Sequence, residues 1–266
     1  MVERGIPADR IDTSRPHPAR IYDYVLGGRD NYEVDREAAE ELLASTPTIR
    51  EAMQANRAFM ERAVRALVQD YGIRQIIDIG TGIPTSPNTH EIAQAIEPRT
   101  RVVYADNDPI VGVHANARLR GTGETGFALA DARDPRSVLD HPATKALIDF
   151  SQPVGVLLIA VLHFVADQED PRGIIRTLRD GLPSGSFLAL THGTADFVDD
   201  RGKEAVRIYS SSTATLNLRP RREVEALFEG FELVEPGLVM VSEWRPDVEV
   251  EEPRRHGVYG AVGRKP

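Results

Sequence analysis

Glycines and carboxylates that follow short apolar runs are the residues best suited to ligand chemistry in this chain. The first run ends in Asp78-Ile79-Gly80-Thr81-Gly82. Glycines at Gly80 and Gly82 allow a tight turn and let a ligand approach the backbone closely. The pattern therefore indicates a ligand-binding turn that includes Asp78 and Thr81, although glycines that only turn the chain would look the same.

The distance in sequence between the glycine turn and the acid after the second run is typical of a ribose-binding site. Asp106 and Asn107 come directly after this run, and Asp106 lies 24 residues beyond Gly82. In nucleotide-binding sheets an acid about 20 residues beyond the glycine turn binds the ribose diol, because a carboxylate accepts both hydroxyl protons. Asp108-Pro109 has the form of a helix N-cap with proline at the first helical position. We therefore expect Asp106 to bind the ribose.

The third run is followed by Asp131 and Ala132. A carboxylate here can accept a hydrogen bond from the exocyclic amine of a purine, and neighbouring backbone groups can contact the ring edge. Asp134-Pro135 again has the form of a helix cap. Asp131 and Ala132 are thus expected to lie against adenine.

The turn after the first run is a poor site for a pyrophosphate. A dinucleotide fingerprint needs a third glycine, but Thr85 stands there, between Pro84 and Pro87. S-adenosylmethionine carries adenine and ribose but ends in an amino acid instead of a diphosphate. The order of glycine turn, ribose acid and adenine acid therefore favours S-adenosylmethionine as the cofactor.

These residues must be positioned by the elements around them, and from residue 73 apolar runs alternate with helical patterns. This alternation predicts an α/β fold with a doubly wound, mostly parallel sheet. Helices are expected near 88–97, 109–120, 134–149 and 170–181, and the last two runs are expected to form an antiparallel edge. The seven expected strands cover 75–79, 101–105, 126–130, 154–161, 187–191, 231–241 and 258–262.

Residues 1–72 contain no convincing strand. Residues 35–43 and 48–71 have the spacing of helices, and the second has apolar residues three and four positions apart. We expect two parts: a helical N-terminal cap or lid over 1–72 and an S-adenosylmethionine-binding α/β domain over 73–266.

The three strand ends resemble those of class I S-adenosylmethionine-dependent methyltransferases. From about residue 12 to the end, the chain also resembles the bacterial S-adenosyl methyltransferase family, once a domain of unknown function. The resemblance implies a Rossmann-like fold and the cofactor, but it supplies no methyl acceptor. Its segments are residues 15–32 (RPHPARIYDYVLGGRDNY), 56–60, 78–82, 161–165, 235–239 and 259–266.

His163, just past the fourth run, is one catalytic candidate. Its placement resembles the base of small-molecule O-methyltransferases, although the residues that follow it differ, and a histidine packed near adenine or capping the next helix fits equally well. His192 is a weaker second candidate.

Other candidates lie in the cap. Residues 20–32 combine glycines with Tyr22 and Asn31, which suggests a loop closing over the site, and tyrosine faces attract a sulfonium. A simply packed cap is the alternative. Arg57, with Asn56, could reach the methionine carboxylate or belong to a solvated helix face.

The composition of the chain limits the classes of partner and ligand that it can bind. A net charge of −9 argues against a broad nucleic-acid-binding face, and the absence of cysteine excludes thiolate nucleophiles and thiolate zinc sites. We find no metal-ligand cluster, no signal peptide and no run long enough to span a membrane, so a cytoplasmic location is expected.

The expected enzyme is an S-adenosylmethionine-dependent methyltransferase acting on a small molecule at oxygen or nitrogen. Two alternatives stay open: a catalytically inactive S-adenosylmethionine-binding sensor or partner subunit, and an NAD-dependent oxidoreductase. The oligomeric state is open as well, and a homodimer is among the states allowed.

Overall fold

The central strands are short, apolar and buried on both faces, as parallel strands covered by helices must be. The computed structural model describes residues 12–118, 123–197, 200–248 and 257–266. All five residues of β1 are buried. The strands are β1 (Gln75–Ile79), β2 (Arg101–Asp106), β3 (Thr125–Leu129), β4 (Gly155–Leu158), β5 (Phe187–Gly193), β6 (Glu232–Leu233), β7 (Val239–Met240) and β8 (Val258–Arg264).

The strands form one sheet in the order β3-β2-β1-β4-β5-β8-β6, and β7 pairs with β8 off this path. The first five pair in parallel, whereas β8 runs antiparallel to β5, β6 and β7. The predicted fold and its antiparallel edge are therefore confirmed. The single strand expected over 231–241 is wrong: it is two short strands, and Pro236 between them has no N–H for a ladder.

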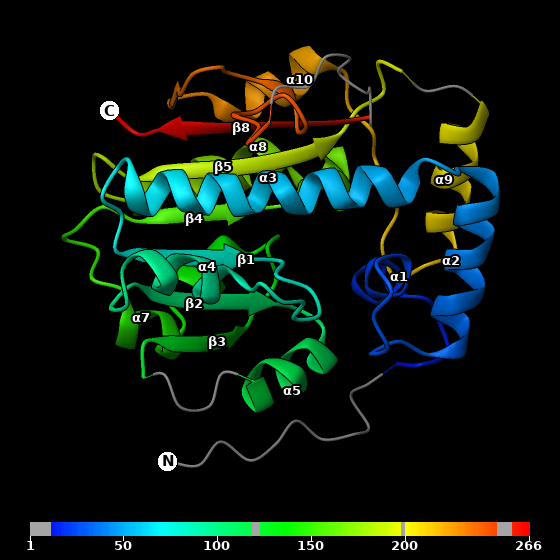
Figure 1. The fold of residues 1–266 in the computed structure, drawn as a ribbon, viewed down its shortest axis with the longest axis horizontal. Coiled ribbons are helices and arrows are strands. Elements are labelled where there is room, and N and C mark those ends of the chain that lie inside the picture. Colours follow the sequence, from blue (N-terminus) through cyan, green and yellow to red (C-terminus); the bar gives the residue numbers. More distant parts are fainter. Residues whose placement is uncertain (1–11, 119–122, 198–199, 249–256) are drawn as a thin grey trace.

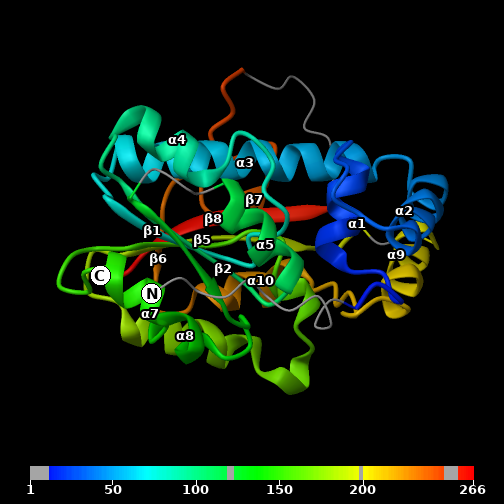
Figure 2. The same ribbon diagram turned by 90° about the horizontal axis from the view of Figure 1, so that it is seen from below.

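Helices cover both faces of the sheet (Figure 2). In that view α3 and α4 lie on one face, and α7, α8 and α10 on the other. One apolar cluster joins Phe59, Leu67 and Val102, and a second joins Val156, Ile174 and Leu227. The described helices are α1 (Pro18–Val25), α2 (Glu33–Ser45), α3 (Ile49–Gln69), α4 (Thr89–Ile96), α5 (Pro109–Arg118), α6 (Pro135–Leu139), α7 (Pro142–Leu147), α8 (Pro171–Gly181), α9 (Asp200–Ser210) and α10 (Arg221–Glu225), with short 3-10 turns at η2 (Leu162–Phe164), η3 (Asp167–Glu169) and η4 (Ala226–Phe228).

Most of the helices expected from the sequence are present with small shifts at their ends. The helix expected over 134–149 is instead α6 and α7, because Pro142 cannot lie inside a continuous helix. The structure adds α1, α9 and α10, which were not expected. Residues 119–120 of the helix predicted over 109–120, and the segment examined for a signal peptide, lie outside the described residues.

The N-terminal helices gather at one end of the sheet. Figure 1 shows the arrowheads of β1 to β5 pointing towards the end where α1, α2 and α9 lie. Their small apolar core includes Ile21, Leu42, Met53 and Tyr209. Since α9 comes from the C-terminal half of the chain, the cap draws on both halves, and the division at residue 72 stays a prediction.

The backbone of the turn after β1 adopts the conformation that its glycines predicted. Gly80 and Gly82 have φ angles of +68° and +66°, in the left-handed region that glycine adopts most readily. A Cβ added at Gly80 would lie 2.5 Å from a Val161 methyl carbon, in the segment after β4. Gly80 therefore combines a special backbone conformation with a close approach between two loops.

We predict that Gly80→Ala destabilises the protein more than Gly72→Ala. Gly72 has nearly the same φ, +67°, but no atom would lie within 4 Å of an added Cβ. Both variants should lose about 1–2 kcal/mol for the left-handed alanine, and Gly80→Ala should lose about 1–3 kcal/mol more from overpacking against Val161. Urea unfolding followed by circular dichroism measures both, and equal losses would contradict the collision.

Candidate functional site

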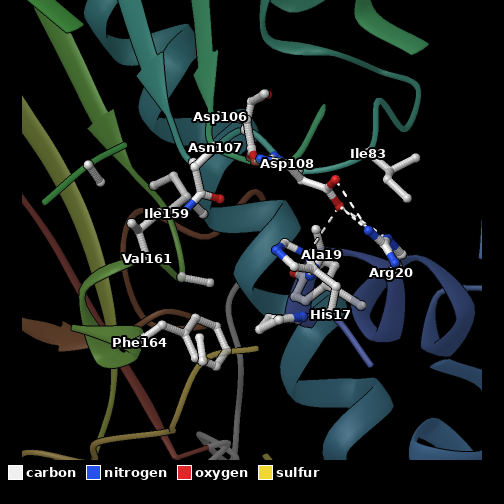
Figure 3. Close-up of a pocket in the computed structure, with 18 of the residues that line it drawn as sticks. His17, Ala19, Arg20, Ile83, Asp106, Asn107, Asp108, Ile159, Val161 and Phe164 are labelled. Carbon is white, nitrogen blue, oxygen red and sulfur yellow. Dashed lines mark hydrogen bonds and ion pairs between the residues drawn. The ribbon is translucent and has the colours of Figure 1, made fainter. Parts of the chain in front are cut away.

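A cavity of about 400 Å³ lies where the carboxyl ends of the strands meet α1. This is the place where open α/β sheets bind ligands. Its walls come from the turn after β1, the ends of β2 and β3, the segment after β4, helices α1 and α3, and Thr213 and Ala214. Figure 3 shows Asp106 and Asn107 on one side, Val161 and Phe164 on another, and opposite them His17, which caps α1, and Arg20 of α1.

Eleven of the fourteen residues proposed from the sequence line this cavity, and their roles stay predictions. Asn31, His163 and His192 do not belong to its lining. The eleven are Tyr22, Asn56, Arg57, Asp78, Gly80, Thr81, Gly82, Asp106, Asn107, Asp131 and Ala132.

Asp106 is buried and ties two loops together. Its Oδ2 accepts a hydrogen bond from the Gly82 N–H at 2.8 Å, and its Oδ1 accepts one from the Asp108 N–H at 2.9 Å. Burial raises the pKa of Asp106 to about 6. Each carboxylate oxygen can accept a further hydrogen bond, so the side chain can still bind a diol.

Asp78 is a second buried carboxylate on the cavity wall. The Thr89 hydroxyl donates to its Oδ2 at 2.6 Å. Burial raises the pKa of Asp78 to about 6, and the Thr89 hydrogen bond and the charge of Arg57 act against that rise. A cationic ligand group beside Asp78 would favour its ionised form.

Asn56 presents an unsatisfied acceptor to the same region. The Tyr22 hydroxyl donates to the Met53 carbonyl at 2.9 Å, so its oxygen can accept the Asn56 Nδ2–H at 3.2 Å. This chain fixes the amide orientation, and the buried Asn56 Oδ1 has no partner within the part of the chain described. A ligand that completes this site must bring a donor, such as an ammonium group.

Arg57 supplies the opposite charge. Its Nη2 donates to the carbonyls of Thr85 and Pro87, each at 2.8 Å. A guanidinium has five N–H donors, so three remain for a carboxylate. Acceptors at Asp78 and Asn56 and donors at Arg57 thus fit the amino-acid end of S-adenosylmethionine.

Asp131 lies towards the other end of the cavity and is already paired. Arg133 donates to it through Nη2 at 2.6 Å, and the Asn107 amide donates at 3.2 Å. Burial raises the pKa of Asp131, but the Arg133 and Asn107 hydrogen bonds outweigh this and hold it below its usual value. Asp131 is therefore ionised at neutral pH, but Arg133 and Asn107 already fill its acceptor positions, so an adenine amine would have to replace one of these donors.

His163 lies behind the cavity wall. Its Nδ1 accepts the Gly193 N–H at 3.1 Å, and burial lowers its pKa well below the usual value. His192 packs beside it, where Arg219 lies 2.9 Å from its Nε2. Both rings are thus used in packing and hydrogen bonding near the segment after β4.

Asn31 also lies outside the cavity lining. Its amide donates to Asp23 Oδ2 at 2.8 Å and to the Gly28 carbonyl at 3.2 Å. These bonds fix the loop after α1.

The sequence interpretation missed the contacts that α1 makes with Asp108. Asp108 caps α5 as predicted, accepting the Ile110 N–H at 3.0 Å. It also forms a buried ion pair with Arg20 at 3.0 Å and lies 3.4 Å from His17 Nδ1 (Figure 3). The clustered charged and aromatic residues of 15–32 hinted at a site, but nothing in the sequence pairs them with Asp108.

Among the described residues, no group of three or more histidine or acidic side chains could hold a metal ion. No described helix is long and apolar enough to cross a membrane.

Solved structures share this architecture. A DUF574 family protein from Streptomyces avermitilis is 47% identical, with a TM-score of 0.91 over 96% of this chain and 99% of its own. A proposed methyltransferase from Thermobifida fusca is 37% identical, with a TM-score of 0.91 over 97% and 98%. An O-methyltransferase family protein from Burkholderia thailandensis, 14% identical with a TM-score of 0.54 over 88% and 60%, shares the fold alone.

A search of curated proteins found no significant match. A sequence profile described as S-adenosyl methyltransferase matches residues 4–266, nearly the whole chain. The chain therefore belongs to the S-adenosyl methyltransferase family, whose members are S-adenosylmethionine-dependent methyltransferases.

Proposed function

We propose that this methyltransferase acts on a small-molecule acceptor, at an oxygen or a nitrogen atom. The observation that carries the proposal is the cavity itself. It measures about 400 Å³, its walls include α1 and Thr213, and the cofactor has to share it. Little volume then remains for the acceptor, which favours a metabolite over a macromolecule.

Different side chains of the cavity would bind different parts of the cofactor. Arg57, Asp78 and Asn56 would hold the amino-acid end of S-adenosylmethionine, Asp106 the ribose and Asp131 the adenine. The bound cofactor supplies a methyl group on a sulfonium, which a nucleophile takes by in-line displacement. Val161 and Phe164 would exclude water, and alignment in such a site can lower the barrier substantially.

The family assignment leaves the NAD-dependent oxidoreductase without support. A sensor that binds S-adenosylmethionine without turnover is the remaining competitor. The cytoplasmic location and a homodimeric state stay predictions of the sequence.

Binding and turnover separate these functions. We expect heat in calorimetry from S-adenosylmethionine and S-adenosylhomocysteine, and none from NAD. Methyl-labelled S-adenosylmethionine with a small-molecule extract should then yield labelled products of low molecular mass. Binding without label transfer would indicate a sensor, and label in protein or nucleic acid alone would contradict the small-molecule acceptor.

Asp106→Ala should weaken S-adenosylhomocysteine binding by about 1.5–3 kcal/mol, because the ribose hydroxyls and two loop N–H groups lose their acceptor. The matched control is Asp134→Ala, which removes an exposed carboxylate that caps α6 and lies outside the cavity. Calorimetry on the two variants measures the difference. Equal affinities would remove Asp106 from this role.

Binding of S-adenosylhomocysteine should strengthen as pH rises through about 6. The pKa of Asp78 is about 6 without ligand, and an ammonium group prefers the ionised carboxylate. If only that form binds, affinity at pH 5 is about tenfold lower than its plateau above pH 7. Binding below pH 6 should therefore release protons.

Asp78→Asn should weaken binding at pH 8 and flatten this profile, leaving the contribution of Asp106. Calorimetry between pH 5 and 8, in buffers with different ionisation enthalpies, measures both affinity and proton release. An unchanged profile in Asp78→Asn would show that another group titrates.

A further inference from the structure

The segment after β4, residues 159–167, forms one wall of the cavity and has an unusual backbone. Val161 and Phe164 lie together on this wall (Figure 3), and Val165 also lines the cavity. Near the start of the segment, Ala160 has a φ of +59°, which is unfavourable for an alanine. Such a conformation persists only where the surrounding structure over-determines it. The surroundings of this segment must therefore hold it in place.

Arg219 holds the segment through its buried side chain. Its Nη1 donates to the Leu162 carbonyl at 3.0 Å, and its Nη2 donates to the Val165 carbonyl at 2.8 Å. Nε and Nη2 also donate to Asp167 Oδ1, at 3.2 Å and 2.6 Å. The two carbonyls stand on either side of Phe164 in the chain. The guanidinium therefore fixes the backbone that carries this ring into the cavity wall.

His192 takes the remaining N–H of the Arg219 guanidinium. Its Nε2 lies 2.9 Å from Arg219 Nη1, and because a guanidinium only donates, Nε2 is the acceptor. The proton of the neutral ring is then on Nδ1, which donates to the Gly193 carbonyl at 2.7 Å. Burial lowers the pKa of His192 to about 4, so the ring stays neutral. His192, a catalytic candidate in the sequence, thus orients the guanidinium.

The backbone around Arg219 is anchored as well. Its N–H donates to the carbonyl of Gly193, the last residue of β5, at 3.4 Å, and its carbonyl accepts the Ala195 N–H at 3.1 Å. Two residues earlier, the Asn217 N–H donates to the His163 carbonyl at 2.6 Å. This short stretch is therefore tied both to the end of β5 and to the segment after β4.

We propose that Arg219 is a positioning residue for methyl transfer, which sets the place of Phe164 and Val165 beside the reacting groups; this rests on the proposed function. Arg219 itself lies outside the cavity lining, so it acts through the residues that it holds. Without it, the carbonyls of Leu162 and Val165 lose their donors and the wall can shift. In-line displacement depends on alignment, and a misplacement of about 1 Å can lower the rate about 100-fold.

The side chains proposed to bind the cofactor are carried by other elements. Asp78 belongs to β1, Asp106 to β2 and Arg57 to α3, and Asp131 follows β3. In the part of the chain described, Arg219 forms no hydrogen bond with any of them. Loss of Arg219 should therefore lower turnover far more than cofactor affinity, whereas a general loosening of the cavity would lower both.

Arg62 provides a matched control. It is a half-buried residue of α3 that lies outside the cavity lining. Its Nε donates to the Trp244 carbonyl at 2.8 Å, and its Nη2 donates to the Val241 carbonyl at 2.7 Å. Like Arg219, it holds a loop through two backbone carbonyls. Arg62→Ala therefore reproduces the structural loss without disturbing the wall of the cavity.

The first test compares Arg219→Ala with Arg62→Ala in the full chain, at a temperature where circular dichroism shows both to be folded. With saturating methyl-labelled S-adenosylmethionine and a small-molecule extract, Arg219→Ala should label small molecules about 100-fold more slowly than the wild type. Arg62→Ala should label them within about twofold of the wild type, and both variants should bind S-adenosylhomocysteine within about twofold, because sites without shared partners are nearly independent. Equal turnover in the two variants, or a parallel loss of affinity and turnover in Arg219→Ala, would overturn the proposal.

The second test is rescue by guanidinium ion, at millimolar concentrations far below those that unfold proteins. The ion should raise the turnover of Arg219→Ala, because it can replace the missing fork between the two carbonyls. Arg219→Lys keeps the charge but not the planar fork, so it should stay slow, and its ammonium group should prevent rescue. Full turnover in Arg219→Lys, or no rescue of Arg219→Ala, would overturn the positioning role.

The wild type separates this inference from the proposed function. A wild type that binds S-adenosylhomocysteine but labels no small molecule would overturn the proposed function and the role of Arg219 with it. A wild type that labels small molecules, with Arg219→Ala equally fast, would overturn the role of Arg219 alone.

Discussion

The ion pair between Arg20 and Asp108 joins the N-terminal cap to the binding edge of the sheet. The two residues are 88 positions apart in sequence and both are buried. Removing one partner of a buried pair leaves an uncompensated charge, which is strongly destabilising. The position of α1 over the cavity, and with it that of His17 and Tyr22, therefore depends on this contact. Asp108 also caps α5, so its single carboxylate joins α1 to α5.

Two other carboxylates of the cavity wall are buried, and burial disfavours their charged forms. Asp78 and Asp106 are buried with raised pKa values, while Asp131 is neutralised by Arg133. Such a site is poised for a ligand that carries positive charge and hydrogen-bond donors. Perturbed carboxylates in a cleft are a physical mark of function, and here they lie beside an asparagine oxygen that lacks a partner in the described structure.

The sequence predicted the elements whose signals are local. Alternating runs predicted the sheet, and the acids after three strands were predicted to converge because parallel strands end at one edge. Short α1 and α10 carry too little periodicity to be recognised. Asn31 and His163 looked as suitable as Arg57, but the direction of a side chain depends on tertiary packing. The pairing of His17 with Asp108 is likewise tertiary, so no spacing rule could have found it.

Helix α3 belongs to the cap through Met53 and to the sheet through Phe59 and Leu67. A chain shortened to residue 73 onwards would therefore lose more than its lid: the largest helix on one side of the sheet would be missing, and Ile76 and Val102 would lose their contacts with it. Because α3 is one continuous helix, a tilt of its first turns would also move its later turns, which pack against β1.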